Sequence, residues 1–424
     1  MGLRGGCVLE SKRSEIFLVD MNAFFISCES ARNPSLKEHP SAVAGDPKNR
    51  TGIILAANYP ARALGVKTAM NVYQAVKLCP QLILVPPDHA YYREKSQEMM
   101  ALLNHFSPVI QQNSIDEAWL DMTGTEKIFG PPVQAAKKIQ TAIQEQLNLP
   151  CSIGISENKF LAKMAADLKK PLGITTLYRE EISKKLWPLP IGEMHGVGKK
   201  TQQLFNAQGL FTIGDLAKAD TSLLIRLCGL HGEKLHQLAR GIDRSKVEHH
   251  CHDDVKSIGN STTLSKDLTD LEEGKRVLLQ MAEKVGQRAR AQNKKGRTVQ
   301  ITVKFNDFTT ITRQTSSTPT YNTQTIYEIA SDLFAALQRK KPIRLLGVTL
   351  SGFDREEALQ LSFLDERTSS EKKEPESKRD TLDKTLDLIK NKYGNATVQR
   401  GSLISKNKEE HHEHSHRIKK KKNL

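Results

Sequence analysis

Near its N-terminus the chain carries the stretch Ile16-Phe-Leu-Val-Asp-Met-Asn-Ala-Phe-Phe25. Its first four residues are apolar and β-prone, which predicts a short buried strand that ends at Asp20. Residues 23–31 have helical spacing, and Asn22 precedes them as a candidate helix cap. The sequence therefore places a carboxylate at the exit of a buried strand.

Further strands and helices alternate with this stretch and predict an α+β domain over residues 1–185. The expected strands cover 53–57, 118–122 and 151–155, and the expected helices cover 91–106, 132–147 and 158–167. Residues 186–243 are helical and punctuated by glycine, and a polar linker follows at 244–256. A second, smaller α+β unit is expected at 257–360, with strands at 299–305 and 345–353 and helices at 271–291 and 325–338.

The last segment, 361–424, is charged and mostly low in apolar residues, so we expect it to be disordered for the most part. One exception is Thr381–Lys392, where Leu382, Leu386 and Ile389 share a helical face.

Composition narrows the functional class. The chain has 424 residues, enough for two to four domains, and a formal net charge of +15. It contains no apolar run long enough to span a membrane and no secretory signal, so we expect a cytoplasmic protein. Its six cysteines are scattered and form no Cys-x-x-Cys pair, which is typical of reduced thiols. The charge favours a polyanionic partner, with nucleic acid ahead of an anionic membrane.

A second acidic motif, Ser114-Ile-Asp-Glu117, comes directly before an expected strand. Adjacent residues in an extended strand point to opposite faces, so Asp116 and Glu117 can share a site only if the chain turns there. The polar run Gln111–Ser114 is compatible with such a turn. Together with Asp20 these acids would suit a hard cation such as Mg²⁺; the alternative, which the spacing alone favours, is that they sit singly on solvated strand ends.

Four motifs in order give the chain a resemblance to the Y-family translesion DNA polymerases, and within them to the DinB type. The motifs are Phe17–Phe25 with Ser27-Cys-Glu29; Asn58-Tyr-Pro-Ala-Arg62 with Gly65-Val-Lys67; Ser114-Ile-Asp-Glu117; and Gly154-Ile-Ser-Glu-Asn-Lys159, continuing through Leu161-Ala-Lys163 to Lys170-Pro-Leu-Gly173. The resemblance covers most of residues 16–360. It implies a right-hand polymerase with palm and fingers at 1–185, a thumb with a helix-hairpin-helix at 186–243 and a little finger at 257–360.

The resemblance also implies roles for individual residues. Asp20, Asp116 and Glu117, helped by the Met21 carbonyl, would bind two Mg²⁺ ions and carry the catalysis. Tyr59, Arg62, Lys159 and Phe24 are assigned to the incoming nucleotide, and Phe25 to a steric gate that crowds a ribose 2′-hydroxyl. Core packing is the other expectation for either phenylalanine. Many members of the type carry Asp where this chain has Asn22.

Two regions are expected to hold DNA. His195-Gly-Val-Gly198 resembles the hairpin of a helix-hairpin-helix, in which Gly196 and Gly198 let a phosphate approach and Lys199 follows. Seven basic residues without an acid lie between residues 284 and 306, and among them we assign Lys294, Lys295 and Arg297 to DNA phosphates. A simple turn and a solvated charged face are the respective alternatives.

Gln360-Leu-Ser-Phe-Leu364 resembles the peptide by which bacterial polymerases bind the sliding clamp, with Gln360, Leu361, Phe363 and Leu364 as contacts. The order Phe-Leu departs from the more usual Leu-Phe, and the end of a strand is the alternative. The histidine-rich runs at 249–252 and 411–416 are not expected to form a structural zinc site.

The leading hypothesis is thus a low-fidelity, lesion-bypass DNA polymerase without proofreading. Its expected partners are primer–template DNA, deoxynucleoside triphosphates and a sliding clamp, and we expect a monomer. A non-catalytic DNA-binding scaffold of the same fold is the rival, and a nuclease that uses the same acids is a third possibility. Only the polymerase would lengthen a primer.

Overall fold

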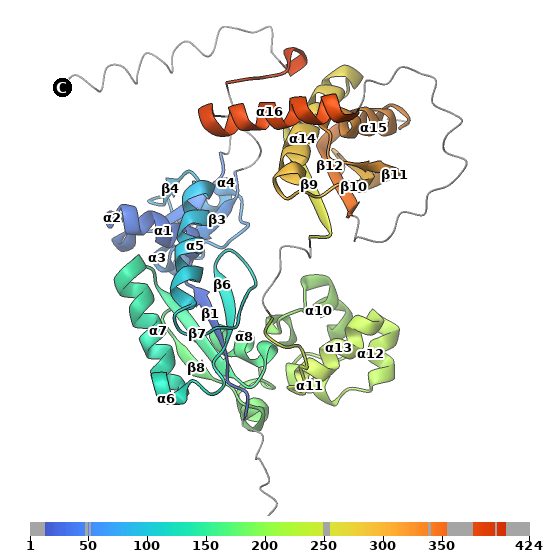
Figure 1. The fold of residues 1–424 in the computed structure, drawn as a ribbon. Coiled ribbons are helices and arrows are strands. Elements are labelled where there is room, and N and C mark those ends of the chain that lie inside the picture. The colour runs from blue at the N-terminus through green and yellow to red at the C-terminus, as the bar shows by residue number, and fades with distance from the viewer. Residues whose placement is uncertain are drawn as a thin grey trace, which may run out of the picture. The chain divides into compact units, whose positions relative to one another are not determined.

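The computed structural model describes residues 13–46, 50, 52–248, 255–337, 341–353, 376–394 and 397–403. The chain forms two compact units, the first of residues 1–47 and 51–253 and the second of residues 48–50 and 254–424. Figure 1 labels their elements. The expected clamp peptide at 360–364 and both histidine-rich runs lie outside the described residues.

A five-stranded sheet is the centre of the first unit. Its order is β5 (Ile110–Gln112), β6 (Glu117–Asp121), β1 (Ile16–Met21), β7 (Cys151–Ser156) and β8 (Ile174–Thr176). β1 is antiparallel to both of its neighbours, and all six of its residues are buried. The apolar run at the start of the expected strand thus becomes the central strand of the sheet.

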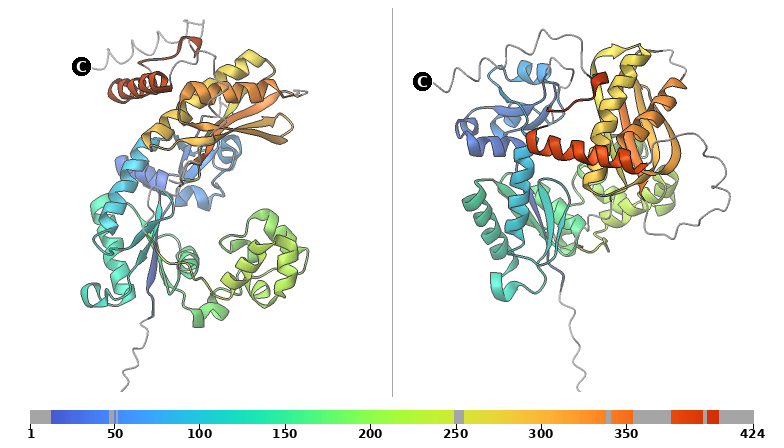
Figure 2. Two further views of the ribbon diagram at one scale, coloured as in Figure 1. Left: turned by 45° about the vertical axis from the view of Figure 1, so that its right-hand side comes forward. Right: turned by 45° about the horizontal axis from the view of Figure 1, so that its top comes forward.

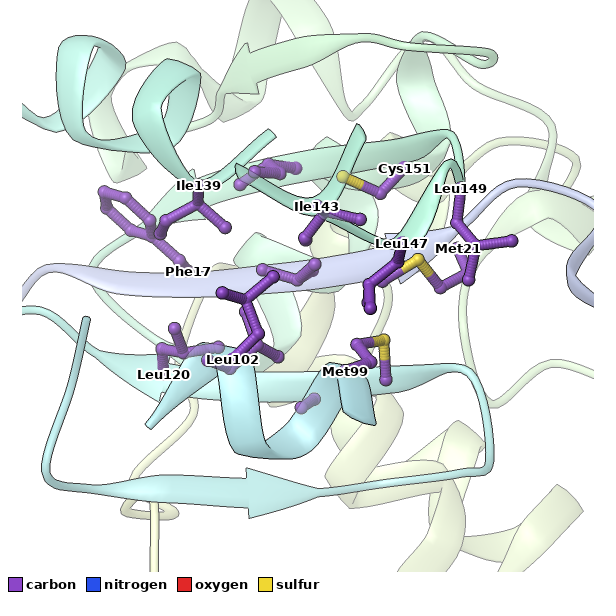
Figure 3. Packing of buried hydrophobic residues seen from close by; sticks show 14 of the residues in the cluster. Phe17, Met21, Met99, Leu102, Leu120, Ile139, Ile143, Leu147, Leu149 and Cys151 are labelled. Atoms are coloured by element: carbon purple, nitrogen blue, oxygen red, sulfur yellow. The ribbon is translucent and has the colours of Figure 1, made fainter. Parts of the chain in front are cut away.

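Side chains of β1 alternate between two apolar clusters. Phe17 and Met21 face the helices α5 (His89–Leu103) and α7 (Pro132–Leu147), where Ile139 and Leu102 are among their neighbours (Figure 3). Ile16 and Leu18 belong to a cluster with Ala162 and Ala166 of α8 (Lys159–Leu168). Because side chains alternate along a strand, Asp20 shares the α8 face with Ile16 and Leu18.

A smaller sheet adjoins the first and is ordered β3 (Ile54–Ala57), β2 (Ser41–Ala44), β4 (Ile83–Val85). The helices α1 (Phe24–Arg32), α2 (Ser35–Glu38), α3 (Tyr59–Ala63) and α4 (Val72–Leu78) accompany it, and α6 (Glu126–Phe129) precedes α7. The expected cap of the first helix is wrong. α1 begins after Ala23, which has a φ of 49°, and no side chain caps it.

The helical segment consists of α9 (Ile182–Lys185), α10 (Lys199–Asn206), α11 (Ile213–Lys218), α12 (Thr221–Cys228) and α13 (Leu230–Ala239). Phe160 and Met164 of α8 join Ile191, Phe205 and Leu235 in its hydrophobic core. A shared core therefore ties this segment to the helix that lies against β1.

The second unit is a four-stranded antiparallel sheet ordered β11 (Thr310–Thr320), β10 (Gly296–Phe305), β12 (Ile343–Phe353), β9 (Ser257–Leu268). Two helices, α14 (Leu271–Ala291) and α15 (Thr323–Ala335), pack on one face of it, as the views in Figure 2 show. A further helix, α16 (Glu376–Tyr393), includes the expected helical segment 381–392. None of the helices in the described ranges is both long and apolar enough to cross a membrane.

Candidate active site

Asp20 and Glu117 face each other where β1 and β6 pair. The antiparallel register sets these two residues directly opposite, which brings their side chains to the same face of the sheet. Both are almost fully buried, with 7% and 8% of their surface exposed. Two carboxylates this close and this buried need compensating positive charge.

Asp116 lies at the same strand end, on the turn that the sequence required. The backbone amides of Asn113 and Ser114 donate to the Glu117 carbonyl over 3.0 and 3.3 Å, which reverses the chain between β5 and β6. The Met21 amide donates to the Asp116 carbonyl over 2.9 Å, and the Asp116 carboxylate accepts from the Ser114 hydroxyl over 2.5 Å. In the part of the chain that the structure describes, no three acid, histidine or cysteine side chains are already gathered as a metal cluster.

Two lysines supply the positive charge. Lys163 Nζ lies 2.9 Å from Asp20 Oδ2 and 2.5 Å from Glu117 Oε2, so it bridges the two acids. Lys170 Nζ lies 2.9 Å from the same Asp20 oxygen and 2.8 Å from Asp167. Burial alone would raise the pKa of Asp20, but the charges of Lys163 and Lys170 outweigh it and hold that pKa below its ordinary value.

Sequence reasoning gave neither lysine a role, although both stand in the fourth quoted motif. Lys163 reaches the acids because α8 lies directly on β7. A Cβ on Gly154 would be 2.0 Å from the Ala162 carbonyl oxygen and 2.4 Å from the Ala166 amide. Only glycine allows this approach, which explains the glycine that opens the motif.

Asn22 holds the turn that carries Lys170. Its amide is 1% exposed, donates to Ser152 Oγ over 3.0 Å and accepts from the Leu172 amide over 2.9 Å. Instead of capping α1, it joins β1 and β7 to the Lys170–Gly173 segment. An amide side chain suits this position because Ser152 Oγ accepts a hydrogen bond from it and the Leu172 amide donates one to it.

The Asn58–Arg62 motif forms the start of α3. Asn58 caps the helix by accepting from the Ala61 amide over 3.0 Å. The Tyr59 hydroxyl is buried and has no hydrogen-bond partner among the described residues. The Arg62 guanidinium carbon lies 5.1 Å from the Tyr59 ring centroid. Burial raises the pKa of Tyr59, whereas the charges of Arg62 and Lys170 act to lower it, so Lys170 is within electrostatic range of the phenol.

Lys159 is held in a different environment. Its Nζ donates to Gln111 Oε1 over 3.1 Å and lies 5.3 Å from the Trp119 ring centroid. The structure therefore brings Lys170 toward Tyr59 and Asp20, and directs Lys159 to Gln111 and Trp119.

The two neighbouring phenylalanines have different surroundings. The Phe24 ring is 3% exposed and belongs to the core, so only its backbone is left for a nucleotide contact. Phe25 is half-buried and stacks on Tyr92 with ring centroids 4.5 Å apart and an interplanar angle of 15°. Tyr92 is itself fixed by a hydrogen bond to Glu29 over 2.7 Å.

The predicted hairpin lies between Met194 and α10. Gly196 has a φ of 96°, which favours glycine, and a Cβ on Gly198 would meet nothing within 4 Å. Val197 is buried between them, and Lys199 at the start of α10 is exposed. A second turn at Gly229 reaches this hairpin, because His231 Nε2 lies 3.3 Å from the Gly196 carbonyl. Sequence reasoning did not find this second turn.

The sheet of the second unit has one polar face. Along β10, Val299, Ile301 and Val303 are buried, and the alternating residues Thr298, Gln300 and Thr302 point to the other side. Their cross-strand partners on β11 are Ser316, Gln314 and Thr312, and on β12 they are Ser351, Thr349 and Gly347. Lys294, Lys295 and Arg297 lie where the chain enters β10.

Two comparisons with known proteins, one with family models and one with solved structures, relate this chain to the same kind of protein. Residues 19–167 match the impB/mucB/samB family, residues 255–363 match the C-terminal domain of that family, and residues 179–210 match the IMS family HHH motif. A solved Y-family DNA polymerase chimera of Dbh and Dpo4 superimposes with a TM-score of 0.71 and 28% identity. It covers 80% of this chain and 99% of its own.

The chain thus belongs to the impB/mucB/samB family and has the right-hand, α+β fold of a Y-family DNA polymerase. Proteins named DNA polymerase IV are similar to it over nearly their whole length. The one from Clostridium kluyveri is 51% identical over 395 residues, 93% of this chain and 99% of the relative. The one from Alkaliphilus oremlandii is 52% identical over 400 residues, 92% of this chain and 99% of the relative.

These relatives confirm the expected DinB type. The chain is a lesion-bypass, DNA-directed DNA polymerase of the DNA polymerase IV group. Its substrates are DNA and nucleotides, and its reaction depends on divalent metal.

Proposed function

We propose that Asp20, Asp116 and Glu117 carry a two-metal phosphoryl transfer, in which a primer 3′-hydroxyl attacks the α-phosphate of a bound deoxynucleoside triphosphate and pyrophosphate leaves as the α–β phosphoanhydride bond breaks. The observation that carries the proposal is the pairing of two buried carboxylates at adjacent strand ends, with Asp116 on the turn beside them. Carboxylate oxygens are the ligands that Mg²⁺ prefers, and the Met21 carbonyl is the proposed fourth ligand.

The residues fit divalent cations. The position between Asp20 and Glu117 holds the ammonium of Lys163, so it already accommodates a cation. Two bound Mg²⁺ ions would lower the pKa of the attacking hydroxyl and stabilise the negative charge that develops on the phosphate. Lys163 neutralises the acids, and its flexible stem allows the ammonium to move aside.

For the nucleotide we propose Tyr59, Arg62 and Lys170 as contacts to the triphosphate. A buried phenol without a partner among the described residues, beside a guanidinium and an ammonium, suits a ligand with many acceptor oxygens and high negative charge. Lys159, which the sequence assigned to this role, is held by Gln111 and Trp119. Phe25 remains our proposed gate, because its half-exposed ring is fixed by Tyr92.

For the duplex we propose the hairpin with Gly196, Gly198 and Lys199, and the β10 entry with Lys294, Lys295 and Arg297. The polar sheet face of Thr298, Gln300 and Thr302 offers further donors to phosphates. We keep the domain bounds of 1–185, 186–243 and 257–360 for palm and fingers, thumb and little finger. Gln360–Leu364 is proposed to bind a sliding clamp, and the working form is proposed to be a cytoplasmic monomer without proofreading.

Primer extension with Mg²⁺ on a primed template tests the catalytic proposal. We expect the wild-type protein to lengthen the primer and Asp116→Ala to leave it unchanged. A scaffold would lengthen no primer in either form, and a nuclease would shorten it. Equal extension by the variant would remove Asp116 from the catalytic set.

A further inference from the structure

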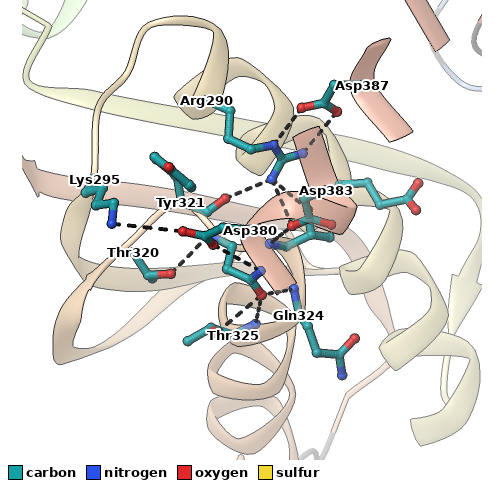
Figure 4. Close-up of polar contacts among 12 residues, drawn as sticks. Arg290, Lys295, Thr320, Tyr321, Gln324, Thr325, Asp380, Asp383 and Asp387 are labelled. Carbon is teal, nitrogen blue, oxygen red and sulfur yellow. Dashed lines mark hydrogen bonds and ion pairs between the residues drawn. The ribbon is translucent and has the colours of Figure 1, made fainter. Parts of the chain in front are cut away.

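The helix α16 lies beyond the matched family domain, which ends at residue 363. It docks on α14 and on the start of α15 through three aspartates on one face, Asp380, Asp383 and Asp387 (Figure 4). Their spacing of three and four residues places them along a single stripe of the helix.

Asp383 occupies a site built for an anion. Its Oδ2 accepts from the amide of Thr323, the first residue of α15, over 2.8 Å and from Arg290 Nη1 over 3.0 Å. Its Oδ1 accepts from Arg400 over 3.2 Å. The side chains of Asp383 and Arg290 are only 4% and 6% exposed. An arginine fork combined with a helix N-terminus is chemistry that also binds phosphate.

The neighbouring contacts extend the same pattern. Arg290 binds Asp387 with two parallel hydrogen bonds of 2.6 and 3.1 Å and donates to the Tyr321 carbonyl over 2.9 Å. Lys295 Nζ lies 4.0 Å from Asp380. Arg290 and Lys295 belong to the basic run at 284–306 that the sequence assigned to DNA. In the docked state, acids of the same chain neutralise both.

Ion pairs and hydrogen bonds are the main contacts that hold the helix, and apolar packing is limited. On the predicted apolar face of α16, Leu382 is 58% exposed, whereas Leu386 and Ile389 are half-buried, and the nearby Leu388 is 69% exposed. Among the residues that the structure describes, α16 contributes no side chain to the hydrophobic core of the second unit. A cavity of about 330 Å³ lies between α14 and the C-terminal segment, and the residues that line it include Gln280, Lys284 and Lys390. A competing anion with similar acceptor oxygens can displace a docked carboxylate, whereas salt alone screens a pair this buried only weakly.

We propose that Arg290, Lys295 and the N-terminus of α15 form a phosphate site for the DNA backbone, and that α16 covers this site with Asp383. Docking of the helix and binding of DNA at this site then exclude each other. The C-terminal segment would act as an internal competitor that lowers duplex affinity until a phosphate replaces the carboxylate.

Hydrogen exchange of the full chain tests the exclusion without any variant. The amides of residues 376–393 are measured alone and with a saturating primer–template duplex, whose binding is verified by anisotropy. The proposal expects faster exchange in α16 when DNA is bound. Unchanged or slower exchange of these amides at saturation would overturn it.

Charge variants test the same point through affinity. D383N/D387N is compared with E272Q/E273Q, which makes the same charge change on exposed positions of α14. We expect the first pair alone to tighten duplex binding several-fold and to steepen the slope of log K against log salt by about 0.9 for each additional phosphate that the protein neutralises. Adding R290Q to D383N/D387N should cancel the increase in affinity. Equal effects of the two pairs, or an increase that survives R290Q, would contradict the proposal.

Discussion

At the scale of single residues, lysine ammonium groups balance the buried acids of the proposed active site. Lys163 lies between Asp20 and Glu117, and Lys170 shares an oxygen of Asp20 with it. Removing one partner from a buried ion pair leaves the other charge uncompensated, so these lysines also stabilise the fold around the site. Their positions follow from Gly154 and Asn22, which fix the elements that carry them.

Lys170 and Lys159 are a matched pair for testing nucleotide contact. We expect Lys170→Met to raise the KM for deoxynucleotides at least tenfold, because a contact to the triphosphate is lost. Lys159→Met should change it less than threefold, since its ammonium contacts Gln111 and Trp119. Steady-state incorporation of a single nucleotide measures both. The reverse order would return the role to Lys159.

Phe25 is the position for testing sugar selection. Phe25→Ala removes the ring that stacks on Tyr92 and should increase ribonucleotide incorporation relative to deoxynucleotide incorporation. Phe308→Ala, a change on an exposed ring of the second unit, is the control and should leave the ratio unchanged. Competition between the two sugars in primer extension gives the ratio. An unaltered ratio in the first variant would exclude Phe25 as the gate.

At the scale of elements, the contact of α8 with β7 sets the geometry of the site. Ala162 and Ala166 pack on Ile16 and Leu18, and the helix backbone touches the strand at Gly154. This close approach brings Lys163 to the acids. The same helix joins the core of the helical segment through Phe160 and Met164, so it connects the sheet to that segment.

Gly154→Ala tests this contact. The added methyl would force α8 away from β7, and we expect a loss of about 1–3 kcal/mol in the free energy of unfolding. Gly198→Ala adds a methyl where nothing lies within 4 Å and should leave stability nearly unchanged. Denaturant unfolding compares the two. Equal free energies of unfolding for the two variants would contradict the close contact of α8 with β7 at Gly154.

Apolar patterning predicted some elements well and others not at all. The helices at 132–147 and 271–291 have the expected bounds, because both are long and amphipathic. β9 and β11 were missed because their polar sequences give no apolar alternation, and pairing with β12 and β10 stabilises them. The acids and Tyr59 were assigned to the proposed site from motifs. Lys163, Lys170 and the aspartate stripe of α16 were missed, because their roles depend on which elements meet in space.

At the scale of the whole molecule, the chain has a net charge of +15, but not all of its basic residues are free to meet a polyanion. Part of the basic run that was expected to hold DNA contacts α16, where the almost fully buried Arg290 pairs with Asp383 and Asp387. The C-terminal segment thus includes the predicted helical stretch 381–392 within α16, and the structure adds its docking through aspartates, which the sequence did not predict.

The proposed clamp peptide is tested on the complete enzyme. Deleting Gln360–Leu364 should abolish the stimulation of synthesis by a sliding clamp, because the apolar anchors are lost, and should leave synthesis without the clamp intact. Primer extension on a long template with and without the loaded clamp measures this. Stimulation that survives the deletion would exclude the motif.

The most direct measurement of the central claim is the single-turnover rate of nucleotide incorporation with Mg²⁺ in Asp20→Asn and Glu117→Gln, with Asp121→Asn at the far end of β6 as the control. We predict that each of the first two variants loses at least about a thousandfold in rate, because several kcal/mol of transition-state stabilisation disappear with a metal ligand. The control should keep a rate close to that of the wild type. Rates near the wild-type value in Asp20→Asn or Glu117→Gln would contradict the assignment of the chemistry to these strand ends.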